Sequence, residues 1–290
     1  MNLVMTLIAG PSAEGRLPDV AARIAGALGS APDWLAPGVA CDVACDDPGA
    51  ETVARQAIGG AAIDVLVQPA DGRRKRVFVA DLESTIIENE MLDELADFVG
   101  LRAHVAEMTR RAMNGELDFA AALNERVTLL KGLPATVLDE AASRIRVMPG
   151  ARALLTTLRA AGVRTALVSG GFTVFAERIA AQLGFDKVVA NRLDIADGRI
   201  AGTVAPPIVT RETKRDALRQ LAQEAGVAMV DTLAIGDGAN DLPMLEAAGL
   251  GIAFHAKPAV AAASRWRLDH ADLTGVLYAQ GYRREEIIGG

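Results

Sequence analysis

The sequence predicts an α/β fold: a doubly wound parallel sheet, interrupted by a block of helices and preceded by a small α/β unit. Three observations carry this prediction. Short apolar runs alternate with helical periodicity after residue 149, as in a sheet with parallel strands. Helical periodicity continues without a strand from 89 to 145, which predicts an inserted helical layer. A run rich in Pro, Gly and cations at 69–76 separates the first seventy residues from the rest.

The composition limits the class of protein. The chain has 290 residues, of which 51% are hydrophobic and 23% charged, so it can bury a large aliphatic core. Its net charge of −7 argues against nucleic-acid and membrane-surface partners, whose binding sites are basic. Cys41 and Cys45 are too few for a disulfide scaffold and poorly spaced for zinc, so we expect reduced thiols. We find neither a convincing signal peptide nor a membrane-spanning segment, and expect a cytoplasmic protein.

Residues 1–72 are predicted to form an accessory α/β domain. Its expected strands lie at 3–9, 39–45 and 63–68, and its expected helices at 19–28 and 50–58. The glycines at 10 and 15 have the spacing of a phosphate loop, but Arg16 and Leu17 stand where Lys and Ser or Thr are required, so we discard that motif. The four cations at 73–76 are interpreted as solvated linker charge rather than as a phosphate or partner site.

Residues 77–290 are predicted to form one catalytic domain with a helical cap inserted at about 88–147. A short apolar strand at 77–80 precedes the four expected helices of the cap, which lie at 89–99, 102–113, 119–130 and 135–145. Strands and helices then alternate as in a Rossmann-like sheet. The expected strands are 163–168, 187–190, 232–235 and 251–254; the expected helices are 173–183, 211–224 and 242–248; a hairpin is expected to turn at 197–198.

Polar residues follow three of these strands directly. They form the runs DLEST (81–85), SGG (169–171) and GDGAND (236–241), and Lys214 opens the helix before the last of these strands. Ligands of open α/β sheets bind at the carboxyl ends of the strands. Carboxylates, a hydroxyl, glycine-exposed amides and an ammonium group at that edge suit Mg²⁺-assisted chemistry on a phosphate.

The acidic residues can supply both a metal site and a nucleophile. Mg²⁺ prefers oxygen ligands, and Asp81 and Asp237 offer carboxylates from two different loops. Asp81 can attack phosphorus to form an aspartyl-phosphate. The leaving oxygen then needs a proton, and Glu83 lies at the same strand end.

The remaining groups can surround the phosphoryl oxygens. Lys214, the hydroxyl of Ser169 and the amides of Gly170 and Gly171 provide the positive charge and the donors that phosphoryl transfer requires. Each motif also has an ordinary interpretation. DLEST can cap a helix, SGG can form a turn, and Lys214 can be a solvated helix residue. The GDGAND run is more specific, and the order of all four at strand ends carries the argument.

This constellation resembles the haloacid-dehalogenase (HAD) superfamily of phosphohydrolases and, within it, the phosphoserine phosphatases. The resemblance extends from about residue 77 to the C-terminus. The motifs that carry it are DLEST (81–85), EMLDELA (90–96), AMNG (112–115), ERVTLL (125–130), VSGGF (168–172), ANR (190–192) and IGDGAND (235–241). The helical insert is the part most specific to phosphoserine phosphatases.

The resemblance implies a role for each candidate residue. The insert is a cap, Asp81 the nucleophile, and Glu83 the general acid and base. Mg²⁺ is bound by Asp81, Asp237 and the backbone carbonyl of Glu83. Supporting residues for the metal and the phosphoryl group are Asp241, Asn240, Ser169, Gly170, Gly171 and Lys214.

The cap residues are implied to recognise serine. Glu90 and Arg126 read its amino and carboxylate groups, which suits the charge of each side chain. Met113 and Phe119 close the apolar side. The alternatives that stay open are ordinary cap core for Met113 and Phe119, and a surface ion pair for Arg126.

Glu83 departs from the family pattern, which usually has Asp at this position. The chemistry and reference pKa of the two carboxyls are nearly the same. The extra methylene can displace the proton by about 1 Å, and errors of that size can cost on the order of 100-fold in rate. We therefore predict an active but slower enzyme with a longer-lived phosphoenzyme.

These observations together predict a Mg²⁺-dependent phosphoserine phosphatase that produces L-serine and phosphate, the last step of serine biosynthesis. Two alternatives remain: a HAD phosphatase or phosphotransferase for another small phosphate ester, and a weakened phosphate-binding sensor. A response regulator is disfavoured, because those domains lack so large an insert. The accessory domain fits an ACT-like, amino-acid-binding module, a homodimerisation domain or a purely structural unit.

Overall fold

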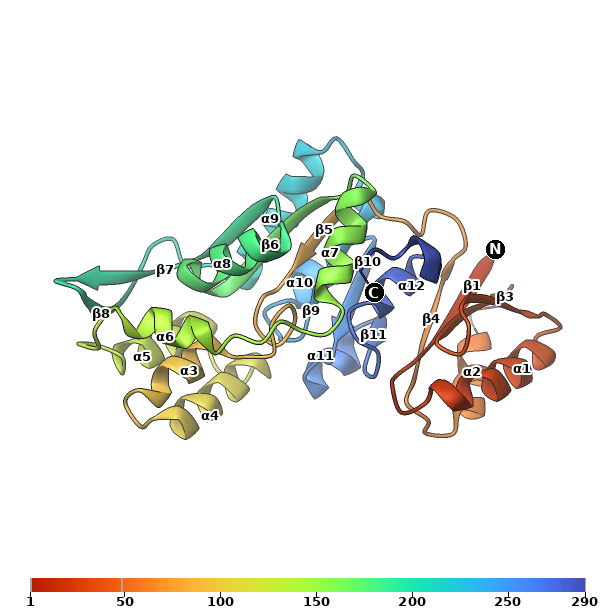
Figure 1. Ribbon diagram of the computed structural model, residues 1–290, viewed down its shortest axis with the longest axis horizontal. Helices are drawn as coiled ribbons and strands as arrows, with labels where there is room; N and C mark the ends of the chain where they lie inside the picture. Colours follow the sequence, from red (N-terminus) through yellow and green to blue (C-terminus); the bar gives the residue numbers. More distant parts are fainter. Residues whose placement is uncertain (1, 48, 290) are drawn as a thin grey trace.

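The strands of the chain form two separate sheets. The structure is a computed structural model that describes residues 2–47 and 49–289. In that part of the chain, a four-stranded sheet has the order β2-β3-β1-β4, and a seven-stranded sheet has the order β11-β10-β9-β5-β6-β7-β8. Figure 1 shows the small sheet at one end of the molecule, the large sheet in the middle and a group of helices at the other end.

The small sheet has a βαββαβ, ferredoxin-like connectivity with antiparallel neighbours. Its elements are β1 (Leu3–Ala9), α1 (Leu17–Ala27), β2 (Pro32–Ala36), β3 (Ala40–Cys45), α2 (Ala50–Ile58) and β4 (Ile63–Pro69). The helices share a core with one face of the sheet, and Cys41 and Cys45 are free thiols within it. β2 was not predicted from the sequence, because Pro32 and Asp33 are poor strand formers.

The large sheet is doubly wound, as predicted. Its strands are β5 (Val77–Ala80), β6 (Arg164–Phe172), β7 (Lys187–Ala196), β8 (Arg199–Ala205), β9 (Thr232–Gly236), β10 (Leu250–Phe254) and β11 (Trp266–Leu268). All neighbours are parallel except β7 and β8. Because both faces are covered, β5 is apolar throughout: Phe78 and Ala80 face one core and Val77 and Val79 the other.

Helices cover both faces of this sheet. Those that share a core with Phe78 are α7 (Ala151–Ala160), α8 (Thr173–Leu183) and α12 (Gly275–Ala279). Those that share a core with Val77 are α9 (Arg211–Glu224), α10 (Leu242–Ala247) and α11 (Pro258–Ala263). No helix within residues 2–47 and 49–289 has the length and apolar character needed to cross a membrane.

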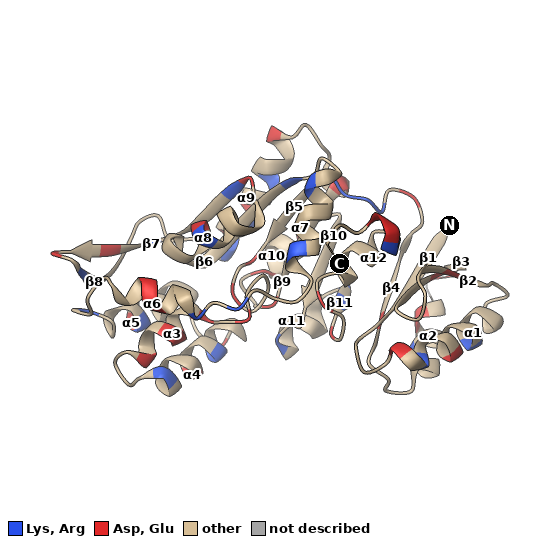
Figure 2. Ribbon diagram, viewed as in Figure 1, with Lys and Arg blue, Asp and Glu red and all other residues tan. Residues whose placement is uncertain are grey.

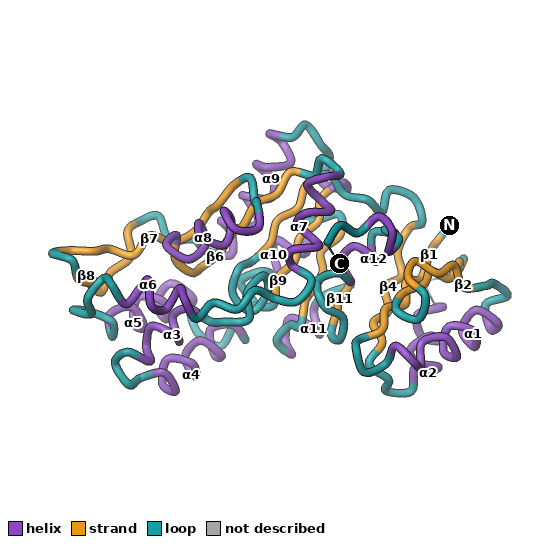
Figure 3. Tube along the Cα trace, viewed as in Figure 1, coloured by secondary structure: helices purple, strands orange, loops and turns teal. Residues whose placement is uncertain are grey.

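The inserted helices form a cap, and the chain enters and leaves the cap through two adjacent segments. They are α3 (Met91–Asp97), α4 (Arg102–Met113), α5 (Phe119–Thr128) and α6 (Val137–Ser143), and Figure 3 shows the loops that join them to the large sheet. Ile87 and Val147 form an antiparallel bridge at the base. In Figure 2, Lys and Arg lie interspersed with Asp and Glu along these helices.

The hairpin formed by β7 and β8 of the large sheet is hydrogen-bonded to the cap. Asp197 and Gly198 turn it with φ values of 51° and 70°, as the sequence predicted. The amides of Gly132 and Ala135, in the cap, donate to the carbonyls of Ile200 and Gly198 at 2.9 and 2.8 Å. The α5–α6 connection is therefore fixed to the large sheet by its backbone.

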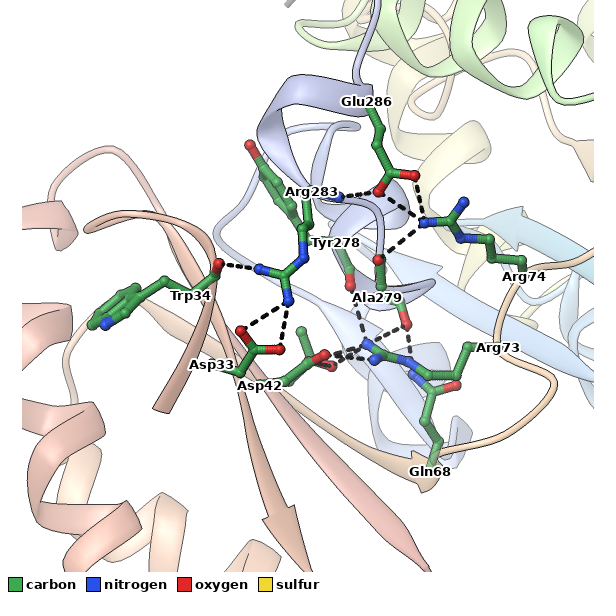
Figure 4. A network of polar contacts seen from close by, with 12 residues as sticks. Asp33, Trp34, Asp42, Gln68, Arg73, Arg74, Tyr278, Ala279, Arg283 and Glu286 are labelled. Carbon is green, nitrogen blue, oxygen red and sulfur yellow. Dashed lines mark hydrogen bonds and ion pairs between the residues drawn. The ribbon is translucent and has the colours of Figure 1, made fainter. Parts of the chain in front are cut away.

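Polar contacts join the small sheet to the C-terminal segment (Figure 4). Arg73 pairs with Asp42 of β3 at 2.5 Å and donates to the carbonyls of Tyr278 and Ala279 at the end of α12. The side chain of Arg73 is only 11% exposed, and Lys75 is 7% exposed. The interpretation of 73–76 as solvated linker charge is therefore wrong for these two residues, because they are used as buried donors.

Asp64 of β4 is a second buried link between the sheets. Its carboxylate accepts the amides of Asp269, His270 and Ala271, which follow β11, at 2.8, 3.2 and 2.9 Å. Trp266 of β11 also donates from Nε1 to the carbonyl of Val67 at 2.9 Å. The two sheets are thus joined by directional contacts and not only by the chain between them.

We expect Asp64→Ala to lower the free energy of unfolding by about 3 kcal/mol, because it leaves buried amides without an acceptor. Urea denaturation followed by circular dichroism measures the loss. Asp71→Ala, an exposed change in the linker, is the matched control and should alter stability by less than about 0.5 kcal/mol. Equal stability of the two variants would contradict the assigned role of Asp64.

Candidate active site

Asp81 lies at the carboxyl end of β5, between two other strand ends that bear functional groups. It is 3% exposed, and its Oδ1 lies 2.7 Å from Nζ of Lys214, which enters from α9. The same Nζ lies 2.6 Å from Oδ1 of Asp241, after β9. Oδ2 of Asp241 accepts the amide of Gly238 at 3.0 Å. Lys214 and Asp241 thus hold each other and Asp81 in a fixed arrangement.

Three buried carboxylates at these strand ends fit a divalent cation. Asp81, Asp237 and Asp241 each offer a ligand atom, and the three atoms lie within 4.8 Å of one another. Asp237 is fully buried; among the residues that the structure describes, its Oδ2 forms an ion pair with Nζ of Lys257 at 3.2 Å, and its Oδ1 has no hydrogen-bond donor. Buried oxygens that lack donors are what a hard cation requires. Both oxygens of Asp241 are already engaged by Lys214 and Gly238, so Asp81 and Asp237 are the freer ligands.

The SGG run at the end of β6 approaches the cap too closely for larger residues. The Gly171 amide donates to Oγ of Ser169 at 2.8 Å. A Cβ on Gly170 would lie 2.5 Å from Cζ of Phe119, and one on Gly171 would lie 2.6 Å from Oε2 of Glu83. The glycines are therefore required by the side chains that close the site, in addition to exposing their amides.

Asn191 on β7 holds this run in place, a role that was not predicted from the sequence. Its Nδ2 donates to the carbonyl of Gly170 at 2.7 Å, and its Oδ1 accepts the amide of Val209 at 2.7 Å. Val209 directly precedes Thr210, the N-cap of the helix that carries Lys214. The signal that could have identified it is its position in the ANR motif, directly after the expected strand at 187–190.

Glu83 connects the sheet to the first helix of the cap. Its Oε1 accepts the amide of Met91, the first residue of α3, at 3.0 Å. The next residue, Ser84, has a φ of 55° and donates from its hydroxyl to Oε1 of Glu90 at 2.6 Å. The turn after Asp81 therefore positions both Glu83 and Glu90.

The predicted substrate residues of the cap meet around one small cavity. Its volume is about 30 Å³, and it lies between the SGG run and the cap. It is lined by Asp81, Glu83, Glu90, Leu92, Ala112, Met113, Phe119, Leu123, Arg126, Gly170, Gly171, Phe172 and Asn240. Ser169, Lys214, Asp237 and Asp241 are buried next to these residues without lining the cavity. Met113 and Phe119 therefore do more than fill the cap core.

Arg126 is buried and held by neutral partners. It is 5% exposed and forms no ion pair with any described residue, so a surface ion pair is the wrong interpretation. Its Nε donates to the Ala122 carbonyl at 3.0 Å and its Nη1 to Oγ1 of Thr109 at 2.8 Å. Thr109 in turn lies 2.8 Å from Oδ1 of Asp93. The sequence signal for Thr109 was a polar residue on the apolar face of α4.

Burial raises the pKa of the carboxyls in this site. The pKa of Asp81 rises to about 7 through burial, although Lys214 opposes the shift. Burial, followed by the charge of Asp81, raises the pKa of Glu83 to about 7. Burial, followed by the charge of Glu90, raises the pKa of Asp237 to about 7. Burial and the charge of Glu83 raise the pKa of Glu90 to about 8.

The fold and the site define a capped α/β enzyme with an acidic centre at the carboxyl edge of its sheet. Residues 78–246 match the haloacid dehalogenase-like hydrolases. The chain belongs to this family of hydrolases.

Curated relatives and solved structures extend the comparison. The chain is 48% identical over 215 residues to the phosphoserine phosphatase SerB2 of Mycobacterium tuberculosis, covering 74% of this chain and 53% of that protein. It thus spans about half the length of this relative. A structure titled as a probable phosphoserine phosphatase from Vibrio cholerae has a TM-score of 0.78 at 31% identity and covers 98% of this chain and 88% of its own. A phospho-aspartyl intermediate analogue of phosphoserine phosphatase has a TM-score of 0.68 at 37% identity, covering 71% and 98%.

The raised pKa values predict how metal and pH together affect stability. In the unfolded chain these carboxyls have pKa values near 4, so the folded protein binds protons more tightly. That contribution is fully present below pH ~4 and is lost as the pH rises through 7 to 8. We expect the Tm in chelator to fall between pH 5 and 8, and Mg²⁺ to raise it most at pH 8, where the ligands are ionised.

Differential scanning calorimetry across this pH range, with Mg²⁺ or with NaCl of equal ionic strength, measures both effects. A Tm in chelator that rises with pH, or a Mg²⁺ effect that is largest at pH 5, would contradict the prediction.

Proposed function

We propose that the chain is a Mg²⁺-dependent phosphoserine phosphatase, which hydrolyses O-phospho-L-serine to L-serine and phosphate. The observation that carries this proposal is the arrangement around one cavity. Asp81, backed by Lys214, lies on the sheet side, and Glu90 and Arg126 line the same cavity on the cap side. The relatives named phosphoserine phosphatases support the same substrate.

The two ends of the substrate have matching partners in the cap. Nη2 of Arg126 donates to no residue in the described part of the chain, so it is free for the serine carboxylate. Glu90 has a pKa of about 8 in the free protein. A substrate ammonium beside it would favour the ionised form and so bind tightly. Met113 and Phe119 would enclose the methylene group between these charges.

Asp81 is the proposed nucleophile and Glu83 the proposed acid and base. One bond forms between Asp81 and phosphorus, and the bond from phosphorus to the serine oxygen breaks while Glu83 gives that oxygen a proton. Glu83 then takes a proton from the water that hydrolyses the aspartyl-phosphate. A pKa of about 7 suits a group that must both give and accept a proton near neutrality.

The other buried groups hold the metal and the phosphoryl oxygens. Asp81, Asp237 and the backbone carbonyl of Glu83 would bind Mg²⁺, which offsets the negative charge of the phosphate. Asp241 would support this site through Lys214, consistent with both of its oxygens being engaged. The phosphoryl oxygens would be held by Ser169, Gly170, Gly171, Lys214 and Asn240.

The cap must move for substrate to enter. A cavity of about 30 Å³ is far smaller than the roughly 300 Å³ or more that small-molecule sites enclose. The amide of Ala239 donates to the carbonyl of Met113 at 2.8 Å, so the sheet and the cap are bonded directly at the mouth. We propose that this contact breaks on opening, whereas the pairing of residues 132–135 with the hairpin persists.

We also propose that 1–72 and 77–290 are separate domains, with the cap at about 88–147. The core between α1, α2 and one face of the small sheet is distinct from the cores of the large sheet, whereas the other face of the small sheet, with Ile8 and Leu66, packs into the core that contains Phe78. The ferredoxin-like connectivity suits an accessory module, which would regulate the enzyme or form a homodimer.

Phosphate release from O-phosphoserine with Mg²⁺ tests the proposed function. We expect selectivity over esters that lack either the carboxylate or the ammonium. Arg126→Ala should weaken kcat/KM for O-phosphoserine about 100-fold and leave phosphoethanolamine, which has no carboxylate, nearly unchanged. Arg110→Ala, exposed on α4 and paired with Glu107, is the control. Preference for another ester, or no turnover at all, would favour the other HAD phosphatase or the sensor.

Glu83 can be tested by two substitutions. We expect Glu83→Gln to lower kcat by 10²–10⁴-fold, because its amide cannot transfer the proton. Glu83→Asp keeps the carboxyl and should retain much more activity. Rapid acid quench with ³²P-labelled substrate separates formation of the phosphoenzyme from its hydrolysis. If Glu83→Gln leaves both steps unchanged, Glu83 is not the acid and base.

A further inference from the structure

A strained turn follows β10 and leads into the acidic centre. His255 has a φ of 43°, in the left-handed region that non-glycine residues seldom adopt. Its amide donates to the Leu268 carbonyl at 2.8 Å, and its Nε2 lies 2.9 Å from the carbonyl of Ala271. Contacts with the chain after β11 therefore hold this conformation, and strain of this kind gathers at functional sites.

The turn brings Lys257 into contact with Asp237 through both its backbone amide and its side chain. The amide of Lys257 donates to the carbonyl of Asp237 at 3.0 Å, and its Nζ lies 3.2 Å from Oδ2 of the same residue. Pro258 then begins α11, which fixes the direction of the chain. Among the described residues, Lys257 is the only cation paired with Asp237.

Two lysines of the site form ion pairs with its three strand-end carboxylates. Lys214 pairs with Asp81 and Asp241, whereas Lys257 pairs with Asp237. The ammonium of Lys257 is therefore the cation that lies against Asp237, on the side of Oδ2.

We propose that Lys257 is a positioning residue for the divalent cation, holding Oδ2 of Asp237 so that Oδ1 is presented to the metal. The terminal torsion of an aspartate is soft, and within the described part of the chain no hydrogen-bond donor fixes Oδ1 of Asp237. The backbone contact and the ammonium together supply that restraint. This inference rests on the metal site of the proposed function. Simple charge repulsion between Lys257 and the metal predicts the opposite effect, so the sign of the change is decisive.

Isothermal titration of Mg²⁺ into the metal-free, full-length protein tests the proposal. We expect Lys257→Met to weaken Mg²⁺ binding at least tenfold and Lys257→Arg to restore it to within a few-fold of the wild type. Lys187→Met, which removes an exposed ion pair with Glu224, is the matched control and should bind Mg²⁺ as the wild type does. Circular dichroism and the Tm in chelator establish folding, and Lys257→Gln replaces Lys257→Met if that variant does not fold.

The possible results distinguish failure of the role proposed for Lys257 from failure of the proposed metal site. A folded Lys257→Met protein that binds Mg²⁺ as tightly as the wild type, or more tightly, overturns the proposal, even if its Tm in chelator is lower. A wild-type protein that binds no Mg²⁺ overturns the metal site and this inference together. Weaker binding by Lys257→Met with an unchanged Lys187→Met supports the role of Lys257.

Discussion

The burial of several carboxylates at one edge of a parallel sheet is the constraint on which the rest of the structure depends. Asp81, Glu83, Asp237 and Asp241 are each at most 9% exposed, a placement that costs free energy unless charge is compensated. Lys214 compensates two of them at distances below 3 Å, but the one cation paired with Asp237 in the described part of the chain is the more distant Lys257. Burial and this excess of negative charge together raise the pKa values of the carboxyls. For the same reason, this edge of the sheet favours binding of a cation or a proton.

The cap buries these carboxylates, and this burial affects both their pKa values and the access of water. Without α3, α4 and α5, the strand ends would be more exposed to water, and the burial that raises the pKa of these carboxyls would be smaller. With the cap closed, Phe119 lies against Gly170 and Met113 is bonded to Ala239. The same closure that raises the pKa of Glu83 toward neutrality would exclude water from Asp81, so in the proposed function substrate binding and proton transfer depend on one movement of the cap.

Sequence patterns predicted the secondary structure and the residues at strand ends. They did not predict the roles of residues whose partners are distant in the sequence. The doubly wound sheet, the helical cap and the gathering of the predicted site residues follow from apolar runs and from the polar residues directly after them. Arg73 and Lys75 looked like linker charge, because Asp42, which accepts from Arg73, lies 31 positions away, and Val230, which accepts from Lys75 together with the nearby Gly72, lies 155 positions away. Asn191, Thr109 and Lys257 contact residues about twenty positions away in the sequence, namely Gly170, Arg126 and Asp237, and a local pattern does not identify such distant partners.

The longer side chain at position 83 is accommodated by its neighbours in a way that bears on its chemistry. A carboxylate displaced by one methylene needs space, and the missing Cβ of Gly171 provides it on the side of Oε2. The other oxygen, Oε1, accepts the amide of Met91 and so fixes the carboxyl to the start of α3. Since a Brønsted acid must be placed as well as tuned, this anchoring limits the misplacement that the extra methylene would otherwise cause. The carboxyl of Glu83 is therefore firmly held, and in the proposed function any cost in rate would arise from where its proton points and not from a loosely held side chain.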